Sequence, residues 1–350
     1  IDLQFEEAGV FAPELDADER IESGGEIREF DLGAADLNSV FAPWAERDEA
    51  EVGVARAAEA LEAARTALAR GEYDRAATEA GRALAPGAAR GEALLLLGDI
   101  FLRQGLAGEA LERFLAARDE AASGGRGRQA RATALLGVGR ALALLARWEE
   151  SAEAMVELLE ANPDAGEARR LLGEAQLRSG DARAAATTLA KATSFASQDA
   201  RVWTLLGEAT LEAGDPVGAE SAFRTALEVD PDATSPRLGL ARLFIEGGRA
   251  DEAASMLRKA LNLLPSYGDA ALALAALEMK RDRPRLAIDV LADLLTADPY
   301  HLDGLFLLGR ALEQAGQREA AAVAFQRVLR LDPQRRHAAQ ALARLERTAV

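Results

Sequence analysis

A period of 34 residues runs from Ala132 to the end of the chain, and it constrains the fold more strongly than any other feature of the sequence. One series on this grid consists of glycines, namely Gly139, Gly173, Gly207 and Gly309. A second consists of small residues, namely Ser151, Ala185, Ala219, Ala253, Ala287 and Ala321. A third consists of prolines, namely Pro163, Pro231, Pro265, Pro299 and Pro333, with Ser197 as the one exception. Small residues where two antiparallel helices cross, followed by a helix breaker, predict a helical hairpin. One hairpin cannot bury its apolar face alone, so the copies must stack as an α-solenoid.

One copy of the repeat, residues 200–233, resembles the tetratricopeptide repeat in Trp203, Leu206, Gly207, Ala219, Phe223, Ala226 and Pro231. Thr210 departs from that pattern, because an aromatic residue is usual there. The grid gives eight units, which start near Ala57, Gly91, Ala132, Gly166, Ala200, Thr234, Gly268 and Leu302. The resemblance covers residues 51–350. It implies an all-α fold, a right-handed α-solenoid of about eight hairpins, and a role as a protein-binding scaffold.

The expected organisation has three parts. Residues 1–48 form an acidic, extended N-terminal tail, and Asp48 with Glu51 resembles a capping box that opens the first helix. Residues 49–335 form the eight hairpins, and residues 336–350 form an amphipathic helix that caps the last one. Seven inserted residues before the third hairpin predict a flexible basic loop at 123–128 (SGGRGR), which is either an inert connection or a contact for acidic residues.

The negative charge is concentrated in the tail. Residues 1–50 hold fifteen acidic and three basic side chains, a balance of −12, whereas the other three hundred residues hold forty-three and thirty-eight, a balance of −5. A nearly neutral repeat body argues against nucleic acid or an anionic membrane surface as the main partner, since both require a basic footprint. One interpretation of the tail is a solvated, disordered acidic segment.

The tail also contains the tetrapeptide Val-Phe-Ala-Pro twice, which favours a second interpretation. The expected docking residues are Val10, Phe11 and Pro13 in the first copy, and Val40, Phe41, Pro43 and the following Trp44 in the second. A proline after a short apolar pair holds the chain extended, a form suited to lying in a groove. The tail then either covers the first hairpins or docks in a groove of the repeats, in its own chain or in a neighbour.

The resemblance implies that the first helix of each hairpin lines a concave face. The expected groove residues there are Leu61, Arg65, Leu95, Leu136, Arg140, Arg170, Arg201, Leu238, Arg242, Leu272, Phe306 and Arg310. The apolar residues would accept Val and Phe side chains, and the arginines would pair with acids of the tail. The Lys and Asn set with which some family members clamp a terminal carboxylate is absent from these positions, so a chaperone-tail adaptor is not expected.

Catalytic motifs are absent from the sequence. It has no Cys, no Gly-x-Ser-x-Gly and no Gly-x-x-x-x-Gly-Lys, and its two histidines, His301 and His337, fall at hairpin junctions where a surface or capping role is expected. We therefore expect no enzyme, no cofactor and no metal site.

Two functions remain. In the first, the protein is a structural subunit whose tail docks on a neighbour, giving head-to-tail self-assembly into a ring or filament. In the second, it is a soluble adaptor whose groove receives a segment of another protein, with the tail as internal competitor. The sequence contains no run of eighteen apolar residues, so it predicts no membrane-spanning helix. The chain begins at Ile1 and not at Met, so we expect either a processed product or a trimmed sequence, from which any signal peptide is already gone. For the compartment, we expect a soluble or exported protein, with an extracellular or cell-envelope location favoured over a cytoplasmic one. Thirty-eight arginines against three lysines are typical of a GC-rich bacterial genome.

Overall fold

The computed structural model describes residues 37–84, 89–123 and 127–347, and it describes 37–51 and Ser123 by their backbone alone. These residues form seventeen α-helices and no strand. The first six are α1 (Leu37–Ala69), α2 (Tyr73–Arg82), α3 (Arg90–Arg103), α4 (Ala107–Ser123), α5 (Gly127–Leu144) and α6 (Trp148–Ala161). The next six are α7 (Gly166–Arg178), α8 (Ala182–Ala192), α9 (Ala200–Glu212), α10 (Pro216–Val229), α11 (Ser235–Glu246) and α12 (Ala250–Leu263). The last five are α13 (Gly268–Lys280), α14 (Pro284–Ala297), α15 (Leu302–Gln314), α16 (Arg318–Leu331) and α17 (Arg336–Arg347).

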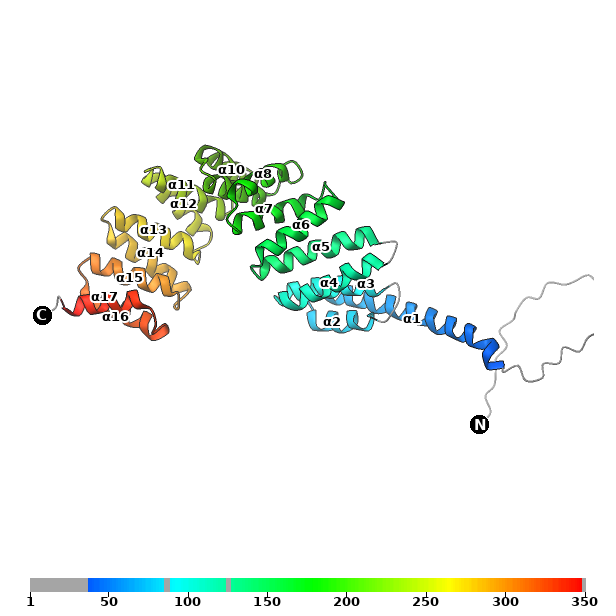
Figure 1. The fold of residues 1–350 in the computed structure, drawn as a ribbon. Helices are drawn as coiled ribbons and strands as arrows, with labels where there is room; N and C mark the ends of the chain where they lie inside the picture. The colour runs from blue at the N-terminus through cyan, green and yellow to red at the C-terminus, as the bar shows by residue number, and fades with distance from the viewer. Residues whose placement is uncertain (1–36, 85–88, 124–126, 348–350) are drawn as a thin grey trace, which may run out of the picture. The chain divides into compact units, whose positions relative to one another are not determined.

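Consecutive helices pair into eight hairpins, from α1/α2 to α15/α16, and each hairpin packs on the next in chain order (Figure 1). This confirms the all-α solenoid of eight hairpins that the 34-residue period predicts. The last helix, α17, buries Ala338, Ala341 and Leu345 against the eighth hairpin, as expected of a capping helix. No described helix is both long enough and apolar enough to cross a membrane.

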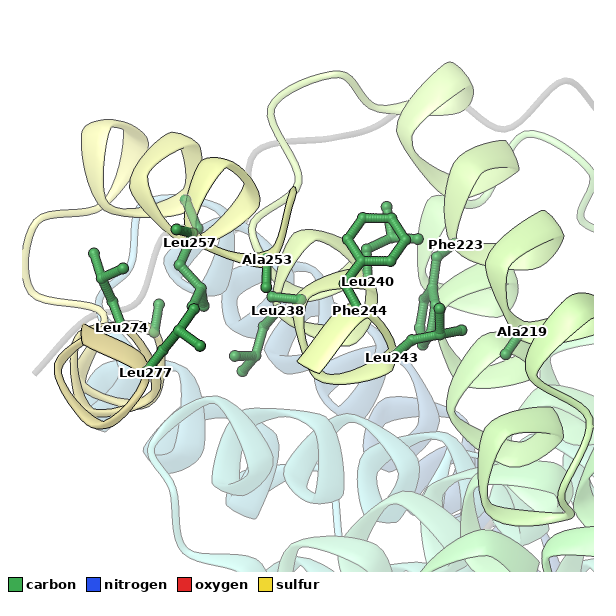
Figure 2. Packing of buried hydrophobic residues seen from close by; sticks show 14 residues of the cluster. Ala219, Phe223, Leu238, Leu240, Leu243, Phe244, Ala253, Leu257, Leu274 and Leu277 are labelled. Atoms are coloured by element: carbon green, nitrogen blue, oxygen red, sulfur yellow. The ribbon is translucent and has the colours of Figure 1, made fainter. Parts of the chain in front are cut away.

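Glycines in the first helices make room for large side chains from the second helices. The ring of Phe223 in α10 is fully buried between α9 and α11. A Cβ atom added to Gly207 in α9 would lie 2.6 Å from this ring, and one added to Gly239 in α11 would lie 2.4 Å from it. The surrounding apolar cluster continues through α12 and α13 (Figure 2). The small residues of the repeat therefore permit close packing within a hairpin and between hairpins.

The turn inside each hairpin uses one left-handed residue. In six of the eight turns that residue is a glycine, at Gly71, Gly105, Gly180, Gly214, Gly248 and Gly316. The third and seventh turns instead carry Ala146, at φ 55°, and Asp282, at φ 57°. Glycine adopts positive φ without a steric penalty, so these two turns keep the shared backbone path at a conformational cost.

The structure differs from the sequence prediction in the second Val-Phe-Ala-Pro segment. Because α1 begins at Leu37, residues 40–44 lie within a helix and are not extended. A helix that is already formed extends at the gain of one hydrogen bond per residue, except where Pro43 lacks an N–H, and residues 45–51 are rich in Ala and Glu, which are good helix formers. The side chains of this segment and all of residues 10–13 lie outside the part of the chain that the structure describes.

The expected basic loop is also shorter than predicted. Since α5 begins at Gly127, Arg128 belongs to a helix. The inserted residues lengthen the two flanking helices. The second helix α4 has 17 residues, against 14 in α16, and the first helix α5 has 18 residues, against 13 in α15. Residues 124–126 lie outside the described ranges.

Candidate binding surface on the first helices

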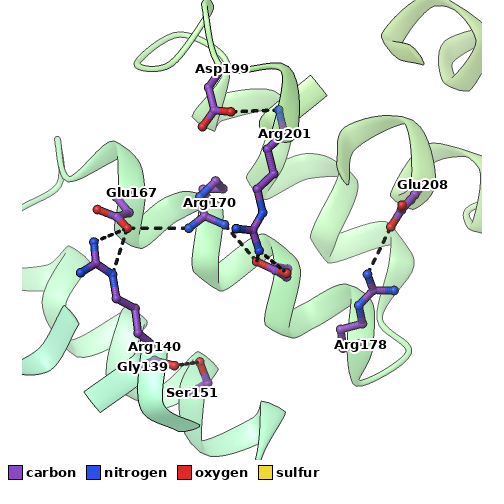
Figure 3. Close-up of polar contacts among 10 residues, drawn as sticks. Gly139, Arg140, Ser151, Glu167, Arg170, Arg178, Asp199, Arg201 and Glu208 are labelled. Carbon is purple, nitrogen blue, oxygen red and sulfur yellow. Dashed lines mark hydrogen bonds and ion pairs between the residues drawn. The ribbon is translucent and has the colours of Figure 1, made fainter. Parts of the chain in front are cut away.

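Charged side chains on successive first helices pair across the hairpin boundaries. Arg140 of α5 donates two hydrogen bonds to Glu167 Oε1 of α7, at 3.1 Å from Nε and 2.5 Å from Nη2 (Figure 3). The two residues are 27 positions apart, as are Arg65 and Glu92, which form an ion pair between α1 and α3. At this spacing, position nine of one hairpin contacts position two of the next.

The next pair has the same spacing, but here the acid comes first along the chain and the arginine second. Glu174 of α7 accepts from Arg201 of α9, with Nη2 at 2.9 and 3.1 Å from its two carboxylate oxygens. Arg170 lies between the two pairs, with Nη1 3.0 Å from Glu174 Oε2 and Nη2 3.7 Å from Glu167 Oε1 (Figure 3). Three arginines and two glutamates therefore form one continuous network over α5, α7 and α9. We name these five residues the central network.

Arg170 is the buried member of the central network, with 9 % of its surface exposed. Burial lowers the pKa of its guanidinium, and the neighbouring Arg201 lowers it further, while Glu174 and Glu167 oppose the shift. The guanidinium stays charged, because arginine titrates far above neutral pH. A buried charge of this kind needs its partners, so the two glutamates hold Arg170 and Arg201 in defined orientations.

Two cavities adjoin the central network and share Arg201. One, of about 490 Å³, lies between α7, α9 and the start of α11, and its charged lining residues are Glu174, Arg178, Arg201, Glu208, Asp230 and Asp232. The other, of about 510 Å³, is lined by Asp164, Gly166, Glu167, Arg170, Phe195, Ala196, Asp199, Arg201 and Val202. We name them the Glu208 cavity and the Phe195 cavity. Each is large enough to receive side chains of a bound segment.

Glu208 has an incompletely paired carboxylate. Its Oε2 lies 3.5 Å from Arg178 Nη2, at the limit of a hydrogen bond, and its side chain is 31 % exposed (Figure 3). Burial raises the pKa of Glu208, while Arg178 and Arg242 act to lower it. A carboxylate that has lost hydration without gaining a close partner favours an additional cation.

Phe195 supplies an exposed aromatic surface to the second cavity. Its side chain is 49 % exposed, and the Arg169 guanidinium lies 4.6 Å from the ring centroid. It lies in the connection between α8, which has 11 residues, and α9, whereas the second helices from α10 to α16 have 14. The missing proline at Ser197 is the sequence signal for this irregular connection, although Phe195 was not among the predicted site residues.

Of the predicted groove arginines, Arg140, Arg170 and Arg201 are brought together in the central network. The others lie on other hairpins. Arg65 pairs with Glu62 and Glu92, while Arg310 lies 4.0 Å from Glu313. Arg242 is exposed on α11. Arg178, which lies one helical turn from Glu174 on α7, was not among the predicted groove residues.

The predicted apolar groove residues are core residues to different degrees. Leu61 and Leu238 are buried, at 3 % and 6 % exposure, so they do not line an open groove. The half-buried ones, which pack against core clusters, are Leu95, Leu136, Leu272 and Phe306. Position five was expected to face a partner, but the neighbouring hairpin covers much of it, because burial of apolar surface drives the stacking.

One of the two histidines is the N-cap residue of a helix. His301 caps α15, where its Nδ1 accepts a hydrogen bond from the Gly304 N–H at 3.0 Å. This confirms the capping role expected for His301. Within the described ranges, no three or more His, Cys, Asp or Glu side chains are grouped so as to hold a metal ion.

Comparisons with known proteins agree with this architecture. A family model described as "Tetratricopeptide repeat" matches residues 140–209, 210–278, 244–299 and 278–345, which is more than half of the chain, and a second with that description matches residues 61–126. The comparison with curated proteins finds no match.

Similar solved structures share the fold at low sequence identity. A tetratricopeptide repeat protein from Parabacteroides merdae is 16 % identical, with a TM-score of 0.56 over 73 % of this chain and 98 % of that one. A chain of the APC/C hetero-tetramer Cut9-Hcn1 is 13 % identical, with a TM-score of 0.55 over 81 % of this chain, which spans about half (54 %) of that one. PilF of Pseudomonas aeruginosa is 20 % identical, with a TM-score of 0.51 over 65 % of this chain and 99 % of that one. At these identities the likeness concerns the fold alone.

Proposed function

The chain belongs to the tetratricopeptide repeat family, and we therefore propose that it is a non-enzymatic protein-interaction scaffold that holds an extended protein segment across α7, α9 and α11. The observation that carries this proposal is the pair of cavities that share Arg201 on adjacent first helices. A fold of this kind binds partners through residues grafted on a common scaffold, so the site and not the fold defines the ligand.

The chemistry of the two cavities defines the segment. Glu208, together with Asp230 and Asp232, favours a Lys or Arg side chain in the first cavity. The exposed face of Phe195 favours an aromatic or aliphatic side chain in the second. Since only α9 separates the cavities, the two side chains belong to one short extended segment.

A selection of random 12-residue peptides on the full-length chain tests this function. We expect the selected peptides to share a basic and an aromatic residue, and Glu208→Gln to weaken their binding by about tenfold through loss of one charge-assisted contact. Glu153→Gln removes an exposed carboxylate from α6, away from both cavities, and should leave binding unchanged. Peptides without a basic residue, or equal losses in both variants, would contradict the proposal.

Self-association through the N-terminal tail is a second candidate, favoured by the doubled Val-Phe-Ala-Pro and by the charge of −12 over residues 1–50. In this case the tail docks on a neighbouring subunit and produces head-to-tail assembly into a ring or filament. Deletion of residues 1–47 should leave a helical solenoid, because hairpins contact only their neighbours, and should lower the mass found by light scattering. If the tail is instead an internal competitor, the deletion will leave the number of subunits per particle unchanged. It will then raise the affinity for the selected peptides.

A further inference from the structure

The turn between α13 and α14 carries the densest basic segment among the eight hairpin turns. Residues 280–285 read Lys-Arg-Asp-Arg-Pro-Arg, with four cations in six positions. Lys280, Arg283 and Arg285 are exposed, and Leu286, the next residue in α14, is 43 % exposed. The surface therefore combines positive charge with an accessible apolar side chain.

A buried carboxylate lies beneath this turn. Glu278 of α13 is fully buried, and its Oε1 accepts from Arg258 Nη2 of α12 at 2.6 Å. Arg281 Nη1 lies 3.8 Å from Oε1, and Arg283 Nη1 lies 3.8 Å from Oε2, which accepts no hydrogen bond from the residues that the structure describes. Arg281 also pairs with Asp251 of α12. One buried carboxylate thus gathers three guanidiniums at one place, and the positive charge there exceeds the negative.

The preceding hairpin shows how such an arginine is held when acids surround it. Arg249 is the equivalent of Arg283, 34 residues earlier, and it donates to Glu220 at 3.0 Å and to Glu252 at 2.7 Å. The positions 34 residues after these two acids are Ala254 and Leu286. Arg283 therefore lacks both carboxylates, and its side chain is 51 % exposed, against 37 % for Arg249.

We propose that residues 280–285, together with Arg258 and Leu286, form the docking surface for the acidic N-terminal segment, residues 1–36, of a second copy of this chain. This inference rests on the self-association candidate above. The segment holds twelve acidic and two basic residues, so its charge complements the turn. It also contains Phe11, two positions before Pro13, and the aromatic ring of Phe11 can pack against an exposed leucine side chain.

The test uses full-length chains with a neutralised turn. In the triple variant Lys280→Gln, Arg283→Gln, Arg285→Gln, Glu278 keeps Arg258 and Arg281. The control variant Arg70→Gln, Arg183→Gln, Lys191→Gln removes the same types and number of exposed cations from other hairpins. Sedimentation velocity over a concentration series at low and high salt gives the association constant, and circular dichroism gives the Tm.

We expect the turn variant to associate about tenfold more weakly than the wild type at low salt, with an unchanged Tm, and the control variant to match the wild type. Deletion of residues 1–36 should cause the same loss, and combining it with the turn variant should cause no further loss. High salt should weaken association of the wild type most.

The outcomes separate the docking surface from self-association itself. If the deletion abolishes association while the turn variant retains it, the tail docks elsewhere, and only the surface assignment is wrong. If the wild type is monomeric at every concentration, self-association fails and the docking surface fails with it. If the turn variant keeps its association but loses binding to fluorescent poly(U), the turn serves a different polyanion and the proposal is wrong.

Discussion

The sixth hairpin (α11/α12) and the seventh (α13/α14) share a backbone plan and differ in what lies beneath their turns. Phe244 in the sixth is 2 % exposed, and the Arg249 guanidinium lies 4.0 Å from its ring centroid. At the equivalent position, the seventh buries Glu278, with Arg283 at 3.8 Å. The arginine follows the turn in both hairpins, but it covers an aromatic ring in one and approaches a carboxylate in the other. The repeat thus sets the path of the chain, while the interior residue beneath the arginine and the acids beside it differ between the two hairpins.

The largest expected effect comes from removing the aromatic side of this comparison. Phe244→Ala should lower the free energy of unfolding by about 3–5 kcal/mol, because it leaves a cavity and removes the surface on which Arg249 lies. Chemical denaturation followed by circular dichroism measures the change. Val323→Ala, at a residue 59 % exposed, is the control and should have little effect. A loss below about 1 kcal/mol at Phe244 would show that the two hairpin interiors do not differ in the way described.

Removing the buried carboxylate of the seventh hairpin should have the opposite effect and raise the free energy of unfolding. Glu278→Leu places at this position the residue that Leu312 supplies in the next hairpin. We expect a gain of about 1–2 kcal/mol, because an apolar side chain replaces a costly buried carboxylate, while Arg258 and Arg283 can hydrate. The same denaturation experiment applies. A loss of stability would mean that the three guanidiniums require this carboxylate in the folded state.

The turns themselves provide an effect of comparable size on the free energy of unfolding. Gly248→Ala should cost about 1–2 kcal/mol, because φ is 73° there and a Cβ atom is disfavoured in the left-handed region. No atom of the described part of the chain, outside the neighbouring residues, lies within 4 Å of the position that the added Cβ would take, so the cost isolates the backbone. Gly53→Ala, in the helix α1 and equally open, should not destabilise. A neutral result at Gly248 would imply that Asp282 also occupies its turn without cost.

The smallest effect concerns pH. The hydrogen bond from Arg249 lowers the pKa of Glu252, and burial partly opposes the shift. A folded-state pKa below the unfolded value gives a contribution to stability that is present above the unfolded pKa and lost as pH falls through the folded one. NMR titration of the Glu252 carboxyl carbon should show this lowered pKa, and Arg249→Gln should raise it toward the usual range, while Arg224 still lowers it slightly. The seventh hairpin has Leu286 at this position and should lack the corresponding titration.

The period predicted the helices and their stacking because each hairpin repeats the same local packing problem. It also placed Arg140, Arg170 and Arg201 on first helices, since position within the repeat determines the face. Burial could not be read in this way, because the exposure of Leu61 and Leu238 depends on the neighbouring hairpin. Departures from the repeat carried the missing information.

Two of those departures were readable. Ser197 replaces a proline next to Phe195, and Glu278 stands between Phe244 and Leu312 at 34-residue spacing. Neither residue type announces its role in isolation. Phe195 becomes significant because α8 ends early and exposes it, and Glu278 because arginines from α12 and from both sides of the turn converge on it.

The glycines that admit Phe223 have a mechanical consequence. The ring occupies the space left by Gly207 in its own hairpin and by Gly239 in the next, so it interlocks two neighbouring hairpins. Phe114 has the same relation to Gly98 and Gly137. Pulling the chain from its two ends would therefore not peel hairpins away one at a time at these places. Two interlocked hairpins would unfold together under force. We therefore expect the second and third hairpins to unfold in one step, and the fifth and sixth hairpins in another.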